Sequence, residues 1–282
     1  MARPRGHGTK LSAYDFGRTT VYASRMDQRF CYSAYVPEDY DEHGTDSYRL
    51  LVAVHGTLRD MTPYRDAFIP FAERHRCIVL APLFPAGIEG PTDVSSYKML
   101  APTAVRYDLL LLSMIDEMKA RYRIGGDRFG LLGFSGGGHF AHRFLYLHPE
   151  RVAAVSIGAP GVVTLLDFDH DFWVGVRDIE AVMGRPINLP AMRRAAVQMV
   201  IGGDDTETWE ITIPPGSRTW RPDGDIAGAN RQDRMRALKA SFENHGIAVR
   251  HDIVPGVGHR SGGIFPAVEA FFDDATADWP AD

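Results

Sequence analysis

Short runs of apolar, β-branched residues alternate with longer amphipathic segments, and this alternation limits the folds open to the chain. The runs that we predict as strands are residues 19–23, 30–36, 49–55, 77–81, 128–134, 152–157, 197–201 and 249–254. Several of them, such as residues 50–54 (LLVAV), are apolar at consecutive positions. Strands of this kind have both faces covered and are typical of parallel sheets.

Between these runs, apolar side chains recur at spacings of three and four residues, which is typical of helices. One such set comprises Val105, Leu109, Leu112, Ile115 and Met118. Three further sets lie within residues 140–147, 235–242 and 264–271. Alternating strands and helices predict an α/β fold, with helices on both faces of a mostly parallel eight-stranded sheet. The first two strands have no helix between them, so we expect them to form an antiparallel edge.

Two longer segments interrupt the alternation, at residues 161–194 and 206–228. We find no linker and no internal repeat, and 282 residues suffice for one large domain. We therefore expect a single domain over residues 1–282, in which the two insertions form a small cap. In an open α/β sheet, ligands bind beyond the carboxyl ends of the strands, where these insertions emerge.

The composition is that of an ordinary globular protein, with 45% hydrophobic residues, 24% charged residues and a net charge of −5. Without a basic bias, we expect neither nucleic acid nor an anionic membrane as a partner. The N-terminus is basic but has no apolar stretch typical of a secretory signal. No run of about 18 apolar residues predicts a membrane span. The expected location is therefore cytoplasmic, and the oligomeric state stays open.

The cysteines and acidic residues do not suggest a metal site or another cofactor. Cys31 and Cys77 are far apart in apolar runs, so we expect two free buried thiols, with one disulfide as the alternative. The acidic run at residues 167–171 lacks the glycine and distal glutamate of a calcium loop. We expect it to be a solvated loop.

A glycine-rich pattern at residues 133–137 (GFSGG) follows one predicted strand and precedes a predicted helix. In that context, G-x-S-x-G predicts a nucleophile elbow, where a strained turn lifts the serine hydroxyl above the sheet edge. The amides at the start of the helix would favour negative charge at the same point. We predict Ser135 as a nucleophile; the alternative is a glycine-rich turn without chemistry.

A serine nucleophile needs a base and an orienting acid, which follow it in the order acid, then histidine. His259 lies in a glycine-flanked loop after the last predicted strand and is the predicted base. The acid should follow the penultimate strand, which ends in Gly-Gly-Asp-Asp. We favour Asp205, and Asp204 remains the alternative.

An oxyanion hole requires backbone amides near the nucleophile. We predict the amide of Gly136 and a second amide from the loop after the third strand, from Thr57 or alternatively Leu58. His55 is expected to support this loop by hydrogen bonding. Arg59 is expected to pair with an acidic residue, or otherwise to hold a substrate carboxylate.

Four aromatic residues in the two insertions are candidates for substrate binding, because aromatic side chains often line apolar pockets. They are Phe172, Trp173, Trp209 and Trp220. The alternative is that they only pack the insertions onto the domain.

Together these residues resemble the α/β-hydrolase superfamily. Residues 108–155 are most similar to the esterase and polyhydroxyalkanoate-depolymerase-like branch, in which a helix, a strand, the elbow and a helix ending in His-Pro-Glu follow one another. The resemblance covers about residues 48–160 and 196–272. It departs from some lipases, because the loop after the third strand reads His-Gly-Thr-Leu rather than HGGG. Secreted depolymerases also carry signal peptides and cysteine bridges, so we do not expect an extracellular polymer-degrading role.

The resemblance implies a serine hydrolase that cleaves a carboxylic ester through an acyl-enzyme intermediate, with a small-molecule ester or acyl substrate and no cofactor. The same triad would serve a peptidase, thioesterase, lactonase or acyltransferase. A hydrolase scaffold used only to bind a ligand is a further alternative.

Overall fold

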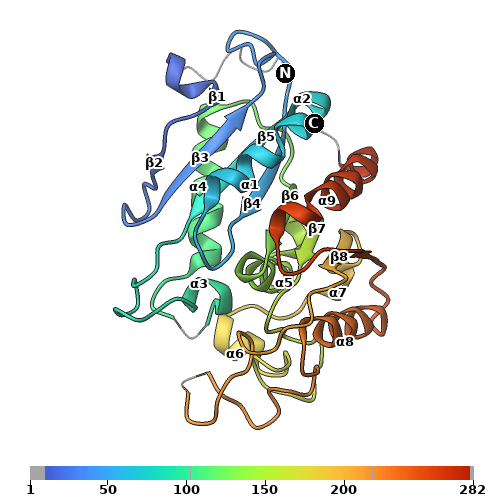
Figure 1. The fold of residues 1–282 in the computed structure, drawn as a ribbon. Helices are drawn as coiled ribbons and strands as arrows, with labels where there is room; N and C mark the ends of the chain where they lie inside the picture. The colour runs from blue at the N-terminus through green and yellow to red at the C-terminus, as the bar shows by residue number, and fades with distance from the viewer. Residues whose placement is uncertain (1–9, 102, 218, 280–282) are drawn as a thin grey trace.

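The computed structural model describes residues 10–101, 103–217 and 219–279, and its strands form one mostly parallel sheet (Figure 1). The strands are β1 Gly17–Arg18, β2 Tyr22–Ala23, β3 Cys31–Val36, β4 Arg49–Val54, β5 Cys77–Leu83, β6 Phe129–Phe134, β7 Val152–Gly158, β8 Ala196–Gly202 and β9 Val249–Val254. Their order is β1-β3-β5-β4-β6-β7-β8-β9, and β2 also pairs with β3. Neighbours from β5 to β9 are parallel, whereas β3 is antiparallel to β5.

Helices cover both faces of this sheet, as predicted. They are α1 Met61–Ala67, α2 Ile69–His75, α3 Ser96–Met99, α4 Tyr107–Arg121, α5 Gly136–Leu147, α6 Ile179–Met183, α7 Leu189–Met192, α8 Arg231–Glu243 and α9 Ser261–Ala275. Short 3-10 turns are η1 Ala13–Asp15, η2 Pro149–Arg151 and η3 Thr276–Asp278. On one face α2 packs on α9 through Phe71 and Phe272, and on the other α5 packs on α8 through Tyr146 and Phe242.

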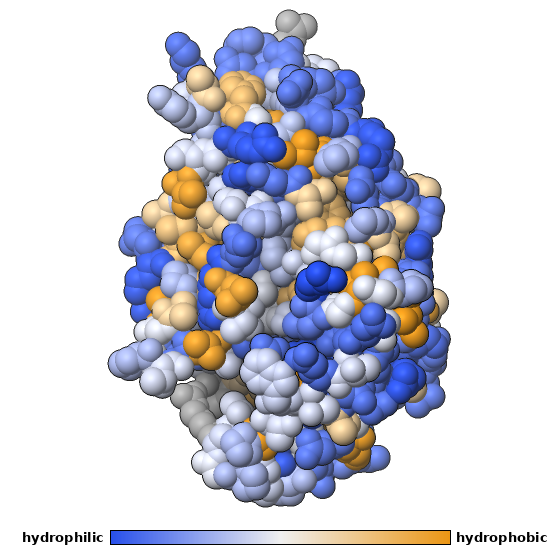
Figure 2. Space-filling model, viewed as in Figure 1, coloured by the Kyte–Doolittle hydropathy of each residue, from blue (hydrophilic) through white to orange (hydrophobic). Residues whose placement is uncertain are grey.

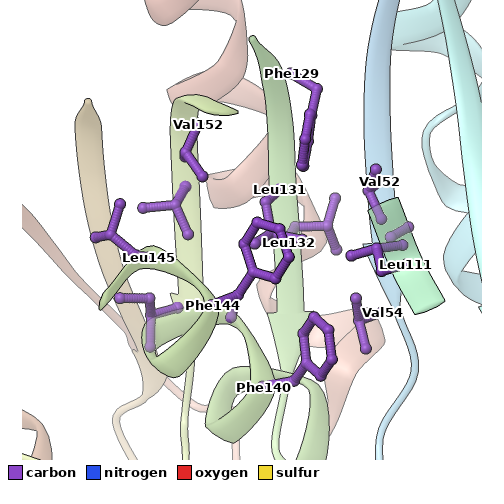
Figure 3. Close-up of a cluster of buried hydrophobic side chains, with 14 of the residues drawn as sticks. Val52, Val54, Leu111, Phe129, Leu131, Leu132, Phe140, Phe144, Leu145 and Val152 are labelled. Atoms are coloured by element: carbon purple, nitrogen blue, oxygen red, sulfur yellow. The ribbon is translucent and has the colours of Figure 1, made fainter. Parts of the chain in front are cut away.

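Part of the buried core lies where α5 packs against the central strands β6 and β7. Figure 3 shows Phe140 and Phe144 of α5 between β6 and Leu111 of α4. Both rings are fully buried and stack with their centroids 5.7 Å apart. Burying each phenylalanine side chain contributes about 2 kcal/mol to stability. This packing fixes the N-terminal end of α5, and so the residue before it, relative to the sheet.

The prediction of a single first strand at residues 19–23 was wrong, and the described sheet has nine strands rather than eight. Two short strands, β1 and β2, pair antiparallel with β3 on either side of Thr19. The Thr19 hydroxyl accepts the N–H of Ala34 at 2.9 Å, a position that the backbone ladder would otherwise use. The edge is antiparallel, as expected.

The helix predicted near residues 105–118 is present as α4, but its buried face differs from the predicted stripe. Leu109 is 38% exposed. The buried positions are Tyr107, Asp108, Leu110, Leu111, Met114, Ile115 and Met118. Because apolar residues occupy more than one side of α4, the spacing alone could not tell which side meets the sheet.

The two insertions, the first of which contains α6, lie together beyond one end of the sheet, next to α8 (Figure 1). A hydrogen bond joins them, from Trp173 Nε1 to the Thr219 carbonyl at 2.7 Å. Two side chains of the acidic run at residues 167–171 have partners: the Asp167 carboxylate accepts a hydrogen bond from His170, and Asp171 forms an ion pair with Arg177.

Both cysteines are free, as predicted. Cys77 is buried, whereas Cys31, the first residue of β3, is only half-buried. Within the described ranges no helix has the length and apolar character to cross a bilayer. On the face shown in Figure 2, small apolar areas are separated by polar side chains.

Candidate active site

Ser135 connects β6 to α5 in a backbone conformation that few residues adopt, with φ 54° and ψ −114°. Its N–H donates to the Gly158 carbonyl of β7 at 2.8 Å, which holds the turn against the sheet. The turn is so tight that a methyl group added at Gly133 would lie 2.1 Å from the carbonyl oxygen of Gly137. Glycine at residue 133 is therefore a steric requirement of this elbow.

His259, in the loop after β9, bridges the serine and a carboxylate. Its Nε2 lies 3.0 Å from Ser135 Oγ, and its Nδ1 lies 2.6 Å from Asp205 Oδ2. With the proton on Nδ1 donated to Asp205, Nε2 is left to accept the serine hydroxyl proton. The ring also rests on Phe134, with centroids 4.7 Å apart.

Asp205 follows β8 and is 1% exposed. Its second oxygen, Oδ1, accepts from Arg231 Nη1 at 3.2 Å. The alternative acid, Asp204, is exposed, and its backbone N–H donates to the Val257 carbonyl. The structure therefore brings Asp205, rather than Asp204, against the imidazole.

The two residues whose amides are expected to form an oxyanion hole, Gly136 and Thr57, lie close together. A methyl group added at Gly136 would be 3.0 Å from the amide nitrogen of Thr57. Neither amide donates a hydrogen bond to another group of the described residues. Leu58, the alternative to Thr57, has a side chain in the solvent and is 93% exposed. Two free amides beside a serine hydroxyl can stabilise an oxyanion.

His55 holds the peptide that presents the Thr57 amide. Its Nδ1 lies 2.8 Å from the Gly56 carbonyl oxygen, and its Nε2 accepts from the Phe84 N–H at 3.0 Å. This pairing places the proton on Nδ1. Burial lowers the pKa of His55 to about 4, so the ring stays neutral near pH 7. The expectation that His55 supports the loop is confirmed.

Arg59 does not pair with an acidic residue among those described, contrary to expectation. It donates to the backbone carbonyls of Phe84, Thr57 and Val94, and its guanidinium lies 4.9 Å from the centre of the Tyr97 ring. Loop carbonyls need donors when they are removed from water, and the five N–H groups of arginine meet that need.

A cavity of about 380 Å³ opens beside His259. The residues that line it are Asp204, Asp205, Glu207, Trp209, Glu210, Gly258, His259 and Arg260. Within the described parts of the chain, no three His, Cys, Asp or Glu side chains are grouped to hold a metal ion.

We compared the sequence and the structure with those of known proteins. No family model and no curated protein matches the sequence. Among solved structures, poly(aspartic acid) hydrolase-1 from Sphingomonas sp. KT-1 superposes with a TM-score of 0.70 and 21% identity, over 94% of this chain and 99% of that one. The LpqC poly(3-hydroxybutyrate) depolymerase from Bordetella parapertussis gives 0.66 and 25%, over 87% and 84%. S-formylglutathione hydrolase from Staphylococcus aureus gives 0.58 and 14%, over 91% and 97%.

The chain has the α/β-hydrolase fold. Esterases and a poly(3-hydroxybutyrate) depolymerase are among its structural neighbours, which is the branch that the sequence resembles.

In this fold, the four aromatic candidates for substrate binding lie in different places. Trp209 lines the cavity beside His259 and is 72% exposed. Trp173 and Trp220 line a separate, smaller cavity between the insertions, and Phe172 is buried. Because the two insertions pack on each other, Trp173 lines the cavity between them and not the cavity beside His259.

The structure also brings to the site residues that the sequence did not single out. Glu207, Glu210 and Arg260 line the cavity, and Arg231 contacts the buried carboxylate of Asp205. No motif marks them, because each is a charged residue in a loop or at the start of a helix. Only their positions in space connect them to the site.

Proposed function

We propose that this α/β-hydrolase is a serine hydrolase that cleaves a carboxylic ester through an acyl-enzyme intermediate. The observation that carries the proposal is the continuous chain of hydrogen bonds from Asp205 through His259 to Ser135 Oγ. An unactivated hydroxyl is a poor nucleophile, and this arrangement supplies the base and the group that orients it.

In the proposed acylation step, Ser135 Oγ attacks the ester carbonyl while His259 Nε2 takes the hydroxyl proton. Asp205 keeps the ring in the correct tautomer and stabilises the imidazolium that forms. The amides of Gly136 and Thr57 stabilise the tetrahedral oxyanion, and one such donor is worth about 3 kcal/mol in the transition state. His259 then gives the proton to the departing alcohol.

In the proposed deacylation step, a water molecule attacks the acyl-enzyme carbonyl and His259 again takes the proton. The tetrahedral intermediate collapses, the Ser135 oxygen leaves with that proton, and the carboxylic acid is released. The cavity beside His259 is open to solvent along residues 204–210 and would admit both ester and water.

A small neutral ester is the proposed substrate. Two structural neighbours are described as acting on polymers, poly(aspartic acid) and poly(3-hydroxybutyrate). In this chain the cavity carries the carboxylates of Asp204, Glu207 and Glu210, which would repel a polyanion such as poly(aspartic acid) but not a neutral polyester. Trp209 offers an apolar surface at the same place. We place the protein in the cytoplasm as part of this proposal.

Hydrolysis of p-nitrophenyl acetate and labelling by a fluorophosphonate test the proposal together. The wild-type protein should hydrolyse the ester and take one label, and Ser135→Ala should lose both while its circular dichroism is unchanged. Ser113→Ala, at a half-buried serine of α4, is the matched control and should keep both. Labelling and turnover that persist in Ser135→Ala would refute the assignment of the nucleophile.

A further inference from the structure

Arg231, the first residue of α8, is a buried arginine beside the proposed triad, and no motif accounts for it. The residue is 2% exposed. Its Nη1 donates to Asp205 Oδ1 at 3.2 Å, and its Nη2 donates to Glu210 Oε2 at 2.6 Å. The guanidinium therefore links the carboxylate that holds His259 to a carboxylate that lines the cavity.

We infer that Arg231 is a positioning residue that fixes Asp205 and, balanced by Glu210, limits how strongly His259 holds a proton. The inference concerns the base of the triad and so rests on the proposed function. Asp205 has two carboxylate oxygens, and each is bound by a different partner. Since a carboxylate held at both oxygens cannot rotate, Oδ2 stays directed at the imidazole.

The charges on this chain of contacts alternate in sign. The Asp205 carboxylate favours protonation of His259, and the Arg231 cation on its far side opposes it. Glu210 faces Arg231 in turn and offsets part of that cation. Asp205 and Arg231 are removed from water, so their charges are weakly screened. The Glu210 side chain is 47% exposed, so solvent screens its charge more and its effect on the protonation of His259 is smaller.

Other charged groups lie near this network and also contribute to the electrostatic potential at His259. They are Asp204, Glu207 and Arg260 of the cavity, His139 of α5, Lys98 of α3, and Arg234 of α8. Among the described residues, none of these groups forms a hydrogen bond with Asp205 or His259.

The test is the pH dependence of kcat/KM for p-nitrophenyl acetate in Arg231→Met, Arg231→Lys and Glu210→Gln. Removing the Arg231 cation should raise the pH at the midpoint of the acidic limb by about one unit, the usual effect of one nearby charge on a pKa. Lysine should restore most of the wild-type midpoint. Glu210→Gln should move it downward, by less than Arg231→Met moves it upward.

Arg234→Met is the matched control, because Arg234 is equally buried on α8 but binds backbone carbonyls of Gly228, Gly161 and Ile211. It should lower stability and leave the midpoint within about 0.2 pH units, since Arg234 forms no hydrogen bond with Asp205 and its charge is offset by an ion pair with Asp225. A purely structural role for Arg231 predicts lower activity at every pH with an unmoved midpoint, and that result would overturn the inference.

An NMR titration of the His259 ring in the same variants separates this inference from the proposed function. The ring midpoint should move in the same directions whether or not any ester is hydrolysed. If the wild type hydrolyses no ester but the ring midpoints move, the proposed function fails and the inference stands. If the ester is hydrolysed and the ring midpoints do not move, the inference fails alone.

Discussion

The two ends of α5 carry similar clusters of charged residues that differ in what the imidazole contacts. At the N-terminal end, Asp205 contacts His259 through one carboxylate oxygen and Arg231 through the other. At the C-terminal end, His148 Nε2 lies 2.8 Å from Asp108 Oδ2, and Arg106 donates to both oxygens of the same carboxylate. Each cluster thus contains a buried aspartate, a histidine and an arginine.

The difference lies at the second ring nitrogen and in access to solvent. His259 presents Nε2 to Ser135 Oγ at 3.0 Å, and its side chain is 21% exposed beside the cavity. His148 is 1% exposed and packs against the Phe144 ring. An Asp–His pair is therefore not in itself a catalytic device; it becomes one where the free nitrogen meets a hydroxyl that a substrate can reach.

The largest expected effect separates the two histidines. His259→Ala should lower kcat for p-nitrophenyl acetate by about 10⁶-fold, as loss of the base does in other triads. His148→Ala should leave kcat/KM within about threefold per folded molecule, because His148 does not reach the cavity. Steady-state kinetics with active-site titration measures both. Equal losses in the two variants would remove the distinction between the clusters.

Substitutions of the two aspartates, Asp205 and Asp108, should affect different properties of the protein. Asp205→Asn should lower kcat by about 10⁴-fold, because an amide favours the wrong imidazole tautomer. Asp108→Asn should keep kcat but lower the free energy of unfolding by about 3 kcal/mol, the cost of removing one partner from a buried ion pair. Urea unfolding and ester kinetics on both variants decide. A loss of kcat in folded Asp108→Asn would contradict a purely structural role.

Acid should weaken the C-terminal cluster. Burial raises the pKa of Asp108, but hydrogen bonds from His148 and Arg106 outweigh it and hold the pKa well below the ordinary value. The stabilisation is therefore complete above the unfolded-state value of about 3.9 and is lost as the pH falls toward the folded value. The difference in unfolding free energy between wild type and Asp108→Asn should be constant down to about pH 4 and shrink below it, measured by urea unfolding. A difference that stays constant below about pH 4 would contradict this.

The smallest expected effect concerns the two tryptophans. Trp209→Ala should raise KM about fivefold with little change in kcat, since burying roughly 40 Å² of apolar surface contributes about 1 kcal/mol. Trp173→Ala should instead lower stability by about 3 kcal/mol or more, because Trp173 is buried between the insertions. Substrate-saturation curves and thermal unfolding separate the two. A raised KM in Trp173→Ala alone would reverse the assignment.

Prediction from the sequence worked best where a pattern is local. The mostly parallel sheet, the helices on both faces and the strand–elbow–helix sequence around Ser135 all follow from residues close together in the chain. Prediction was weaker at the sheet edge, where the Thr19 hydroxyl replaces a backbone partner. It was weaker again on α4, where two sides are apolar and only contact with the sheet decides which is buried.

The sequence by itself determined the fold class and singled out Ser135, His259 and an Asp204–Asp205 pair, because apolar spacing and glycine-rich turns are set by local backbone geometry. The tertiary structure decided which aspartate meets the imidazole, that Arg231 lies behind it, and that Trp209 rather than Trp173 lines the cavity. The Asp205–His259 and Ser135–His259 contacts join side chains 54 and 124 residues apart. Directions of side chains over such separations depend on how strands and helices pack, which no local pattern encodes.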